Sequence, residues 1–423
     1  MRITGLGHAG MFIETAGGSI ICDPVVKPSF FGSWFVFPDN RALDWERFGR
    51  DADYLYISHR HRDHFDTWLL DTYIRKDIKV LLPDYPTDDL EQDLRGLGFT
   101  NIIYTQAGVP IQDGALKLMV TPLRAPSDGP IGDSSLSIDD GTASILNQND
   151  SHPLDLETLM SFSKPEAYFT QVSGAIWWPM VYDLPQDAKQ NFAQLKRDAQ
   201  NKRAMYYIDK VDAEHVFPMA GPPMFLREEL FRYNGRGLEN DSIFTDHAQF
   251  LAHMKEQRPE QKGYLFLPGT QVDLNGGVLD VTQTLYTEAE IDRVYNDKWN
   301  YLAEQRDTRQ AEVQAEVDSR APILAPDEML AAIKEWWEPL LRRARTIRNG
   351  VGGNVRFRIG DLDMVVDFPK AKVREYAGEE CIYWYTIPAD LVSTNIADHE
   401  IDWSNSIFLS MQFEVGRSGK FNE

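Results

Sequence analysis

Residues 58–66 place three imidazoles and two carboxylates in one short run of the chain. The run reads Ser-His-Arg-His-Arg-Asp-His-Phe-Asp, and its imidazoles belong to His59, His61 and His64. Imidazole and carboxylate groups together suit zinc or iron. Histidines also gather on solvated loops, but three of them interleaved with acids favour a metal site over that alternative. We therefore predict that His59, His61, Asp63 and His64 are metal ligands.

The segment before this run indicates how its side chains can converge. Residues 52–57, Ala-Asp-Tyr-Leu-Tyr-Ile, read as a short apolar strand. Because residues i and i+2 of a strand share a face, His59 and His61 can point the same way where the strand ends. Asp63 and His64 then follow in a turn that can fold back beside them.

Short strands and helices alternate around the histidine run. The expected elements are a hairpin from residues 11–15 and 19–22, a helix over 68–74, a strand over 80–82 and a helix over 87–97. This mixture of hairpins and intervening helices predicts an α/β fold in which two sheets pack face to face under a cover of helices.

The pattern changes near Thr287, where Thr-Glu-Ala-Glu is typical of a capping box that begins a helix. This helix is expected to run to about Ser319. A further helix over 328–347 and a strand-turn-strand unit over 355–368 follow. We therefore predict a catalytic domain over 1–284 and a C-terminal α+β extension over 285–423.

Composition and charge exclude several classes of protein. The chain has 423 residues, of which 43% are hydrophobic and 26% charged, as in a globular protein. Its formal net charge of −22 argues against a nucleic acid or an anionic membrane as partner. A local basic pocket or a metal can still attract a negatively charged substrate. Only Cys22 and Cys381 are present, which argues against a disulfide framework and favours a reducing cytoplasm.

The pattern His59-x-His61-x-Asp63-His64 resembles the signature of the metallo-β-lactamase superfamily, whose fold is an αββα sandwich. The segments Gly-His-Ala-Gly at 7–10 and Cys-Asp-Pro at 22–24 look like the branch that contains the ascorbate-phosphate lactonases. Longer blocks resemble the sugar-nucleotide N-acyl hydroxylases, which act on UDP-N-acetylmuramic acid or CMP-N-acetylneuraminate. These blocks lie at residues 31–34, 129–134, 173–177, 179–182, 220–223 and 403–410.

The resemblance implies a fold, a cofactor and a partner. It implies a metallo-β-lactamase-like αββα sandwich with a C-terminal α+β extension, and a non-heme iron enzyme that hydroxylates an N-acetyl group, with a role in the cell wall. Those hydroxylases carry a Rieske iron–sulfur domain, which needs two Cys and two His that this chain does not supply. Either the chain is the catalytic part of a longer protein, or a separate electron-transfer partner serves it, or it has lost the oxidative chemistry.

The metal shell needs a ligand from farther along the chain, because no histidine lies between His64 and His152. Asp150 follows an expected strand at the point where the superfamily places its bridging aspartate, and the alternative for it is a turn residue. Asp128 and Asp133, in a loop rich in Gly and Pro, are weaker candidates, since loop acids are usually solvated.

Three further residues are candidates for contact with the substrate or the metal. His8 lies near the metal by analogy with the family, or else it braces the turn at Asp23. Trp177 and Tyr182 are expected to form an apolar wall against a sugar or base, although packed aromatics more often belong to the core.

Two enzyme classes and one non-enzymatic class remain open. An iron-dependent monooxygenase acting on a nucleotide sugar agrees with a site of two or three imidazoles, a carboxylate and open positions. A zinc-dependent hydrolase of a lactone or phosphodiester would instead use metal-bound water, with Asp63 orienting or deprotonating it. A scaffold that keeps the fold without catalysis is the third possibility.

Overall fold

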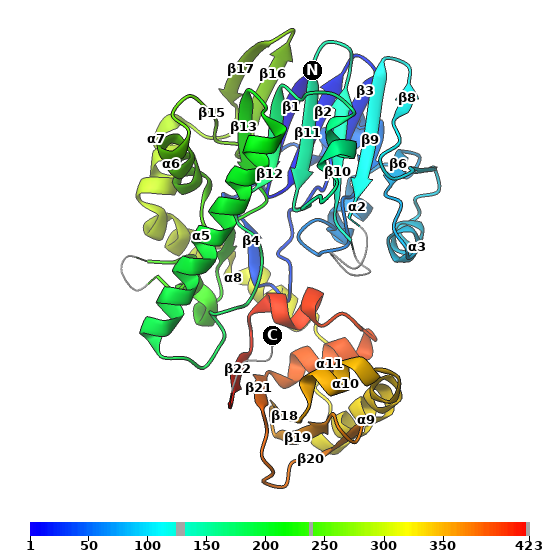
Figure 1. The fold of residues 1–423 in the computed structure, drawn as a ribbon, viewed down its shortest axis with the longest axis vertical. Coiled ribbons are helices and arrows are strands. Elements are labelled where there is room, and N and C mark those ends of the chain that lie inside the picture. Colours follow the sequence, from blue (N-terminus) through cyan, green and yellow to red (C-terminus); the bar gives the residue numbers. More distant parts are fainter. Residues whose placement is uncertain (124–131, 237–239, 420–423) are drawn as a thin grey trace.

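The computed structural model describes residues 1–123, 132–236 and 240–419. Its larger, N-terminal unit is built on two stacked sheets, labelled in the upper half of Figure 1. One sheet has the order β17 (Val278–Gln283), β16 (Thr270–Asn275), β1 (Arg2–Gly7), β2 (Gly10–Thr15), β3 (Gly18–Cys22), β5 (Tyr54–Tyr56), β6 (Lys79–Leu82) and β7 (Ile102–Tyr104). The other has the order β15 (Lys262–Gly263), β13 (His215–Met219), β12 (Ala167–Gln171), β11 (Ser144–Asn149), β10 (Ser134–Asp139), β9 (Leu116–Pro122) and β8 (Ile111–Asp113).

Apolar residues fill the space between the sheets and cover both outer faces. The inner layer joins Ile13 and Ile20 of the first sheet to Leu136 and Phe169 of the second. Helices α1 (Trp45–Asp51), α2 (Thr67–Thr72) and α3 (Asp89–Gly96) pack on the first sheet, and α4 (Leu156–Met160), α5 (Gln186–Val211) and α6 (His247–Gln257) pack on the second. Removal of this apolar surface from water stabilises the four-layered arrangement.

The strand directions bring distant segments to one edge of the sandwich. β3, β5, β6 and β7 are parallel to one another, and β1 runs the same way because it pairs with antiparallel β2. The turn at His8 after β1 and the loop 58–66 after β5 therefore leave the same edge. In the second sheet, β11 leads into Asp150 and the chain enters antiparallel β10 through Asp133.

The C-terminal unit has its own sheet, with the order β20 (Lys372–Glu375), β19 (Leu362–Asp367), β18 (Asn354–Ile359), β21 (Tyr383–Ile387) and β22 (Glu414–Arg417). Helices α9 (Pro326–Arg343), α10 (Arg345–Val351) and α11 (Ala389–Ala397) accompany it, followed by a π-helical turn over Ser404–Phe408. The helix expected over 328–347 is thus interrupted at Ala344, which leaves the helical conformation with ψ 53°.

Two hydrophobic clusters connect the parts of the chain. In one, Trp34 and Met180 pack with Leu391 and Ile407 of the C-terminal unit. In the other, α7 (Glu288–Asn296) and α8 (Lys298–Asp318) pack against Phe35, Phe231 and other residues of the N-terminal unit. Helices α7 and α8 therefore share a core with the sandwich, and the proposed boundary at residue 285 stays a prediction.

Two smaller strands, β4 (Trp34–Val36) and β14 (Pro223–Phe225), pair beside the sandwich and lead into a 3₁₀ helix over Glu228–Asn234. Within the described part of the chain, every helix is too short or too polar to cross a lipid bilayer.

Candidate metal centre

The loop after β5 folds back on itself and gathers its three histidines. His59 and His64 are fully buried, and their ring centroids lie 4.2 Å apart. The ring of His61 lies 4.5 Å from that of His59, with His61 Nδ1 2.8 Å from His59 Nε2. The convergence expected from the spacing of these residues is thus present in the structure.

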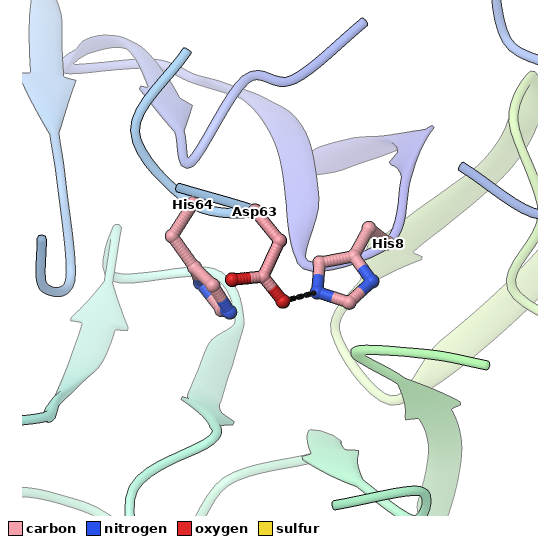
Figure 2. Close-up of side chains that lie close together, drawn as sticks. All are labelled: His8, Asp63 and His64. Carbon is pink, nitrogen blue, oxygen red and sulfur yellow. Dashed lines mark ion pairs between the residues drawn. The ribbon is translucent and has the colours of Figure 1, made fainter. Parts of the chain in front are cut away.

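Carboxylates from three separate segments approach these rings. Asp63 Oδ2 lies 2.9 Å from His8 Nε2, and the close-up in Figure 2 shows this pair beside His64. Asp150 Oδ1 lies 3.4 Å from His64 Nε2. Asp133 Oδ1 lies 3.1 Å from His59 Nε2, so this loop acid belongs to the centre, whereas Asp128 falls outside the described residues.

The side chains form three overlapping groups, and within each group the ligand atoms lie within 4.8 Å of one another. The groups are His59, His61 and Asp133; His59, His64 and Asp150; and His8, Asp63 and His64. Despite the short separations, His8 Nε2, His64 Nε2 and Asp150 Oδ1 are buried without hydrogen-bond geometry to any residue that the structure describes. Buried polar atoms normally have partners. Converging nitrogen and oxygen atoms without hydrogen-bond partners are the arrangement expected of the ligands of a metal ion.

A buried aspartate orients the imidazoles from behind. Asp23 accepts hydrogen bonds from the Ser58 backbone N–H (2.7 Å) and hydroxyl (2.6 Å), and its Oδ2 lies 3.0 Å from His64 Nδ1. The Ser58 hydroxyl also lies 2.9 Å from His59 Nδ1. A carboxylate on Nδ1 fixes the tautomer that leaves Nε2 free for a metal. Asp23 belongs to the Cys-Asp-Pro segment at residues 22–24 that resembles the lactonase branch. That resemblance does not predict how Asp23 orients the imidazoles, because its contacts join residues on neighbouring strands of the sheet.

Burial and neighbouring charges set the protonation states of the centre in the absence of metal. Burial and the nearby imidazoles lower the pKa of His59 well below its usual value. Burial opposes the charged form of His64, but Asp150, Asp23 and Asp63 outweigh it and raise its pKa well above the usual value. Burial also opposes ionisation of Asp63, yet His64 and His8 lower its pKa. Because metal ligands bind in their deprotonated forms, metal binding would compete with protons at these groups.

The centre opens into a cavity of about 330 Å³. Its lining comprises His61, Asp63, Asp133, Asp150, His152, Gln171, Gly174, Ala175, Ile176, Trp177, Lys196, Gln200, Arg203, Ser404 and Leu409. Trp177 lies in this wall and packs against Phe408 of the C-terminal unit, with ring centroids 5.2 Å apart. Tyr182 lies outside the lining and packs against Trp178, and His8 contacts Asp63 rather than the cavity. Substrate contact by Trp177, Tyr182 and His8 stays a prediction.

The C-terminal unit also contacts the backbone of the ligand loop. Asn405 Nδ2 donates to the carbonyl of Arg60 (3.2 Å), and its Oδ1 accepts from the backbone N–H of Arg62 (3.4 Å). One amide side chain thus bonds to the peptide groups on both sides of His61. The π-helical turn that contains Asn405 also brings Ser404 to the cavity, so residues from both units build the site.

Comparison with known proteins places the chain in a family. Residues 2–112 match the family description "Beta-lactamase superfamily domain", and residues 329–423 match "Rv3818-like, SCP2-like domain". Over 430 residues the chain is 41% identical to a Mycobacterium tuberculosis protein named "Putative Rieske 2Fe-2S iron-sulfur protein Rv3818", covering 100% of this chain and 83% of that protein. The chain belongs to the Rv3818 family. A Mycolicibacterium smegmatis protein, also named a putative Rieske 2Fe-2S iron-sulfur protein, is 41% identical over 433 residues.

Similarity outside the Rv3818 family is lower. The cytidine monophosphate-N-acetylneuraminic acid hydroxylase of Mus musculus is 31% identical over 130 residues, which cover 28% of this chain and 22% of that protein. Among solved structures, an isothiocyanate hydrolase from Delia radicum gut bacteria is 15% identical with a TM-score of 0.44, covering 65% of this chain and 100% of that one. The diiron β-hydroxylase CmlA from Streptomyces venezuelae is 15% identical with a TM-score of 0.41, covering 67% and 54%.

The β-lactamase-superfamily match and the stacked sheets confirm the predicted αββα sandwich, and the C-terminal extension is SCP2-like. The β-lactamase-superfamily match and the converging donor atoms indicate a metal-dependent enzyme.

Proposed function

We propose that the protein is an iron-dependent monooxygenase that hydroxylates the N-acetyl group of a nucleotide sugar, UDP-N-acetylmuramic acid, to give the N-glycolyl form. In this reaction one atom of O₂ enters the methyl group. Two electrons from an external donor and two protons convert the other atom into water. The metal ligands that we propose are His59, His61, Asp63, His64 and Asp150, and we add Asp133, whose carboxylate lies within one group of donor atoms with His59 and His61.

The observation that carries the proposal is the group formed by His59, His61 and Asp133. Two imidazoles and one carboxylate with open positions are typical of non-heme iron oxygenases. His61 and Asp133 both line the cavity, so an ion held by this group would border the space where a substrate would lie. The similarity to a CMP-N-acetylneuraminic acid hydroxylase supports the same class of reaction.

Iron bound at this centre would activate oxygen. The chain's own residues would bind and orient the substrate and exclude water. The apolar face of Trp177 offers a surface for a sugar ring, and Ile176 continues it beside the acids of the cavity. Asp63 is the group to which we assign a proton-accepting role, because its carboxylate lines the cavity beside the other proposed ligands.

An electron donor is required, and we propose a Rieske-type iron–sulfur protein or domain. The names of the mycobacterial relatives support this assignment. Cys22 is buried on β3 within the sandwich, whereas Cys381 lies just before β21 in the C-terminal unit. These two thiols therefore do not build one cluster site.

Turnover with a defined metal tests the proposal. The protein is purified without oxygen, loaded with iron or zinc, and mixed with UDP-N-acetylmuramic acid, ¹⁸O₂, a reductase and a Rieske protein. Iron-loaded protein is expected to give an N-glycolyl product that carries one ¹⁸O atom. The variant Asp133→Ala is expected to lose this product, while Asp113→Ala, altered on β8 away from the centre, retains it.

A zinc-dependent hydrolase is the alternative function. It requires activity without oxygen or reductant, with water rather than O₂ as the source of the new oxygen atom. Oxygen-independent cleavage of a lactone or phosphodiester by zinc-loaded protein, with no N-glycolyl product from iron-loaded protein, would overturn the monooxygenase.

A further inference from the structure

Helix α5 contributes two cations to the cavity that the metal centre opens into. Lys196, Gln200 and Arg203 all line the cavity, and their spacing of four and three residues places them on one face of the helix. The acids and His61 of the metal centre line the same cavity. In Figure 1, α5 runs from the level of the C-terminal unit up to the second sheet.

Neither cation pairs with an acid in the part of the chain that the structure describes. Among residues 1–123, 132–236 and 240–419, no carboxylate forms an ion pair with Lys196 or Arg203. At the far end of α5, by contrast, Arg258 pairs with Asp209 at 2.7 Å and Lys164 with Asp212 at 2.7 Å. In a chain with a net charge of −22, acids are available for pairing, so two unpaired cations on one wall indicate a binding role.

Lys196 is half-buried, whereas Arg203 remains exposed. Burial lowers the pKa of Lys196, and the nearby charge of Arg203 lowers it further. Burial likewise lowers the pKa of Arg203, although Tyr207 and Asp150 act in the opposite direction. The two like charges on one wall of the cavity repel each other, and an anion bound between them would offset this repulsion.

The segment opposite α5 is shaped around the same side chains. A Cβ atom on Gly174 would lie 3.1 Å from Arg203 Nη2, so the guanidinium lies close against this backbone. Gln200 Nε2 donates to the carbonyl of Gly174 at 2.7 Å. Gln200 is only 3% exposed, and its Oε1 is buried without a hydrogen-bond partner among the described residues. A buried acceptor on the cavity wall is available for a donor group of a ligand.

We propose that Lys196 and Arg203 bind a phosphate group of the substrate, and that Gln200 accepts a hydrogen bond from a neighbouring hydroxyl or amide. This inference deepens the proposed function and rests on it for the choice of a nucleotide sugar. The cavity, about 330 Å³, lies at the small end of the usual ~300–1,000 Å³ range for ligand sites. It encloses a sugar-sized group beside the metal, while the charged diphosphate lies against α5 and the nucleoside extends outward.

Calorimetric binding to the full-length protein tests the inference without any turnover. The probes are UDP-N-acetylmuramic acid, UDP, uridine and free N-acetylmuramic acid. Wild-type protein is expected to bind the first two and to bind uridine far more weakly. Because a charge-assisted hydrogen bond is stronger than a neutral one, Arg203→Gln and Lys196→Met are each expected to weaken UDP binding by about 10- to 100-fold.

Lys202→Gln is the matched control, because Lys202 is an exposed cation of α5 that does not line the cavity. It is expected to bind UDP as the wild type does. Arg203→Lys, which keeps the charge, is expected to recover part of the affinity. Unchanged thermal unfolding and metal content in each variant would show that only the ligand contact was lost.

The outcomes separate this inference from the proposed function. Unchanged UDP affinity in Arg203→Gln and Lys196→Met would overturn the phosphate site and leave the monooxygenase standing. Arginine-dependent binding of free N-acetylmuramic acid, but not of UDP, would assign the cations to the carboxylate and also overturn it. Arginine-dependent UDP binding by a protein that forms no N-glycolyl product would support the phosphate site and reject the monooxygenase.

Discussion

Nε2 of His8 lies 2.9 Å from a carboxylate oxygen of Asp63, and the two residues leave the same edge of one sheet from different strands. The ring of His8 is also 5.2 Å from that of His64, which Asp150 approaches from the second sheet. The turn after β1 therefore completes a group that the histidine loop alone does not form. His8 is a positioning residue for Asp63, or a ligand beside it, and both roles make metal affinity depend on it.

The variant His8→Ala is expected to weaken metal binding by about 10- to 100-fold, as loss of a residue that orients a ligand typically does. Titration of the metal-free protein with Fe²⁺ under anaerobic conditions measures the change. His253→Ala, altered on α6 outside the centre, serves as the control and should bind metal normally. Equal affinities for His8→Ala and the wild type would show that the contact with Asp63 has no part in metal binding.

Asp23 provides a second prediction, because its carboxylate contacts both the Ser58 hydroxyl and His64 Nδ1. In Asp23→Asn, with the amide oxygen kept on the Ser58 backbone N–H, an NH2 group replaces Oδ2. This group donates rather than accepts beside His64 Nδ1, so the imidazole loses the partner that fixes its tautomer. We expect metal affinity to fall by about 10- to 100-fold with the fold retained. Iron titration measures the metal affinity, and circular dichroism on the same samples measures whether the fold is retained.

Asp66→Asn is a demanding control for this variant. Asp66 is also a buried aspartate of the loop, but it caps α2 through Leu69 N–H and bonds the backbone of Val26 and Lys27. An amide keeps only one accepting oxygen, so it can cap Leu69 or accept from Val26 and Lys27, but not both; leaving buried N–H groups unpaired is expected to cost about 1–3 kcal/mol of stability, with little effect on metal affinity. A loss of metal affinity as large as that of Asp23→Asn would attribute both effects to general loosening of the loop.

The parts of the fold that follow from local pattern were predictable from the sequence. The hairpin of β2 and β3, the strand before the histidine run and α2 and α3 all lie within a few residues of their expected positions. Helix breaks were harder. The helix expected from 287 to about 319 is interrupted at Asp297, whose φ of −119° and ψ of 33° end α7 before α8 begins. No Gly or Pro marks that break.

The candidate site likewise contains residues that local sequence predicts and residues that it does not predict. The convergence of His59, His61 and His64 follows from spacing along one loop. Asp133 had only the appearance of a solvated loop acid, and its approach to His59 depends on the pairing of β10 with β11 in the other sheet. The contact of Asn405 with the ligand loop joins two units far apart in sequence. Such contacts arise from tertiary packing, which one sequence without relatives does not encode in a readable pattern.

Asn405 itself gives the next prediction. Asn405→Ala leaves the Arg62 N–H and the Arg60 carbonyl without their partner, and a buried unsatisfied group costs about 1–3 kcal/mol. We expect faster amide hydrogen exchange at residues 60–62 and weaker metal binding, with the sandwich otherwise unchanged. Asn354→Ala, on β18 away from the loop, should alter neither property. Wild-type exchange rates in the loop of Asn405→Ala would show that the C-terminal unit does not restrain it.

The last prediction concerns stability against acid and depends on His247 at the start of α6. His247 is 2% exposed, its ring stacks on Phe37 at 6.4 Å, and its Nδ1 lies 3.1 Å from the Tyr295 hydroxyl. Burial, with a contribution from Lys298, lowers its pKa to about 4. Between pH 6.5 and pH 4 the unfolded chain therefore binds a proton that the folded chain does not, so stability falls as the pH falls.

Since one pKa unit corresponds to about 1.4 kcal/mol, this residue is expected to remove up to about 3 kcal/mol of stability as the pH drops from 7 to 4. His247→Gln has no such group, and its unfolding free energy should decline less steeply than that of the wild type. Chemical denaturation at several pH values gives both slopes, and His253→Gln should follow the wild-type curve. Parallel curves for His247→Gln and the wild type would show that His247 is protonated equally in the folded and unfolded chains.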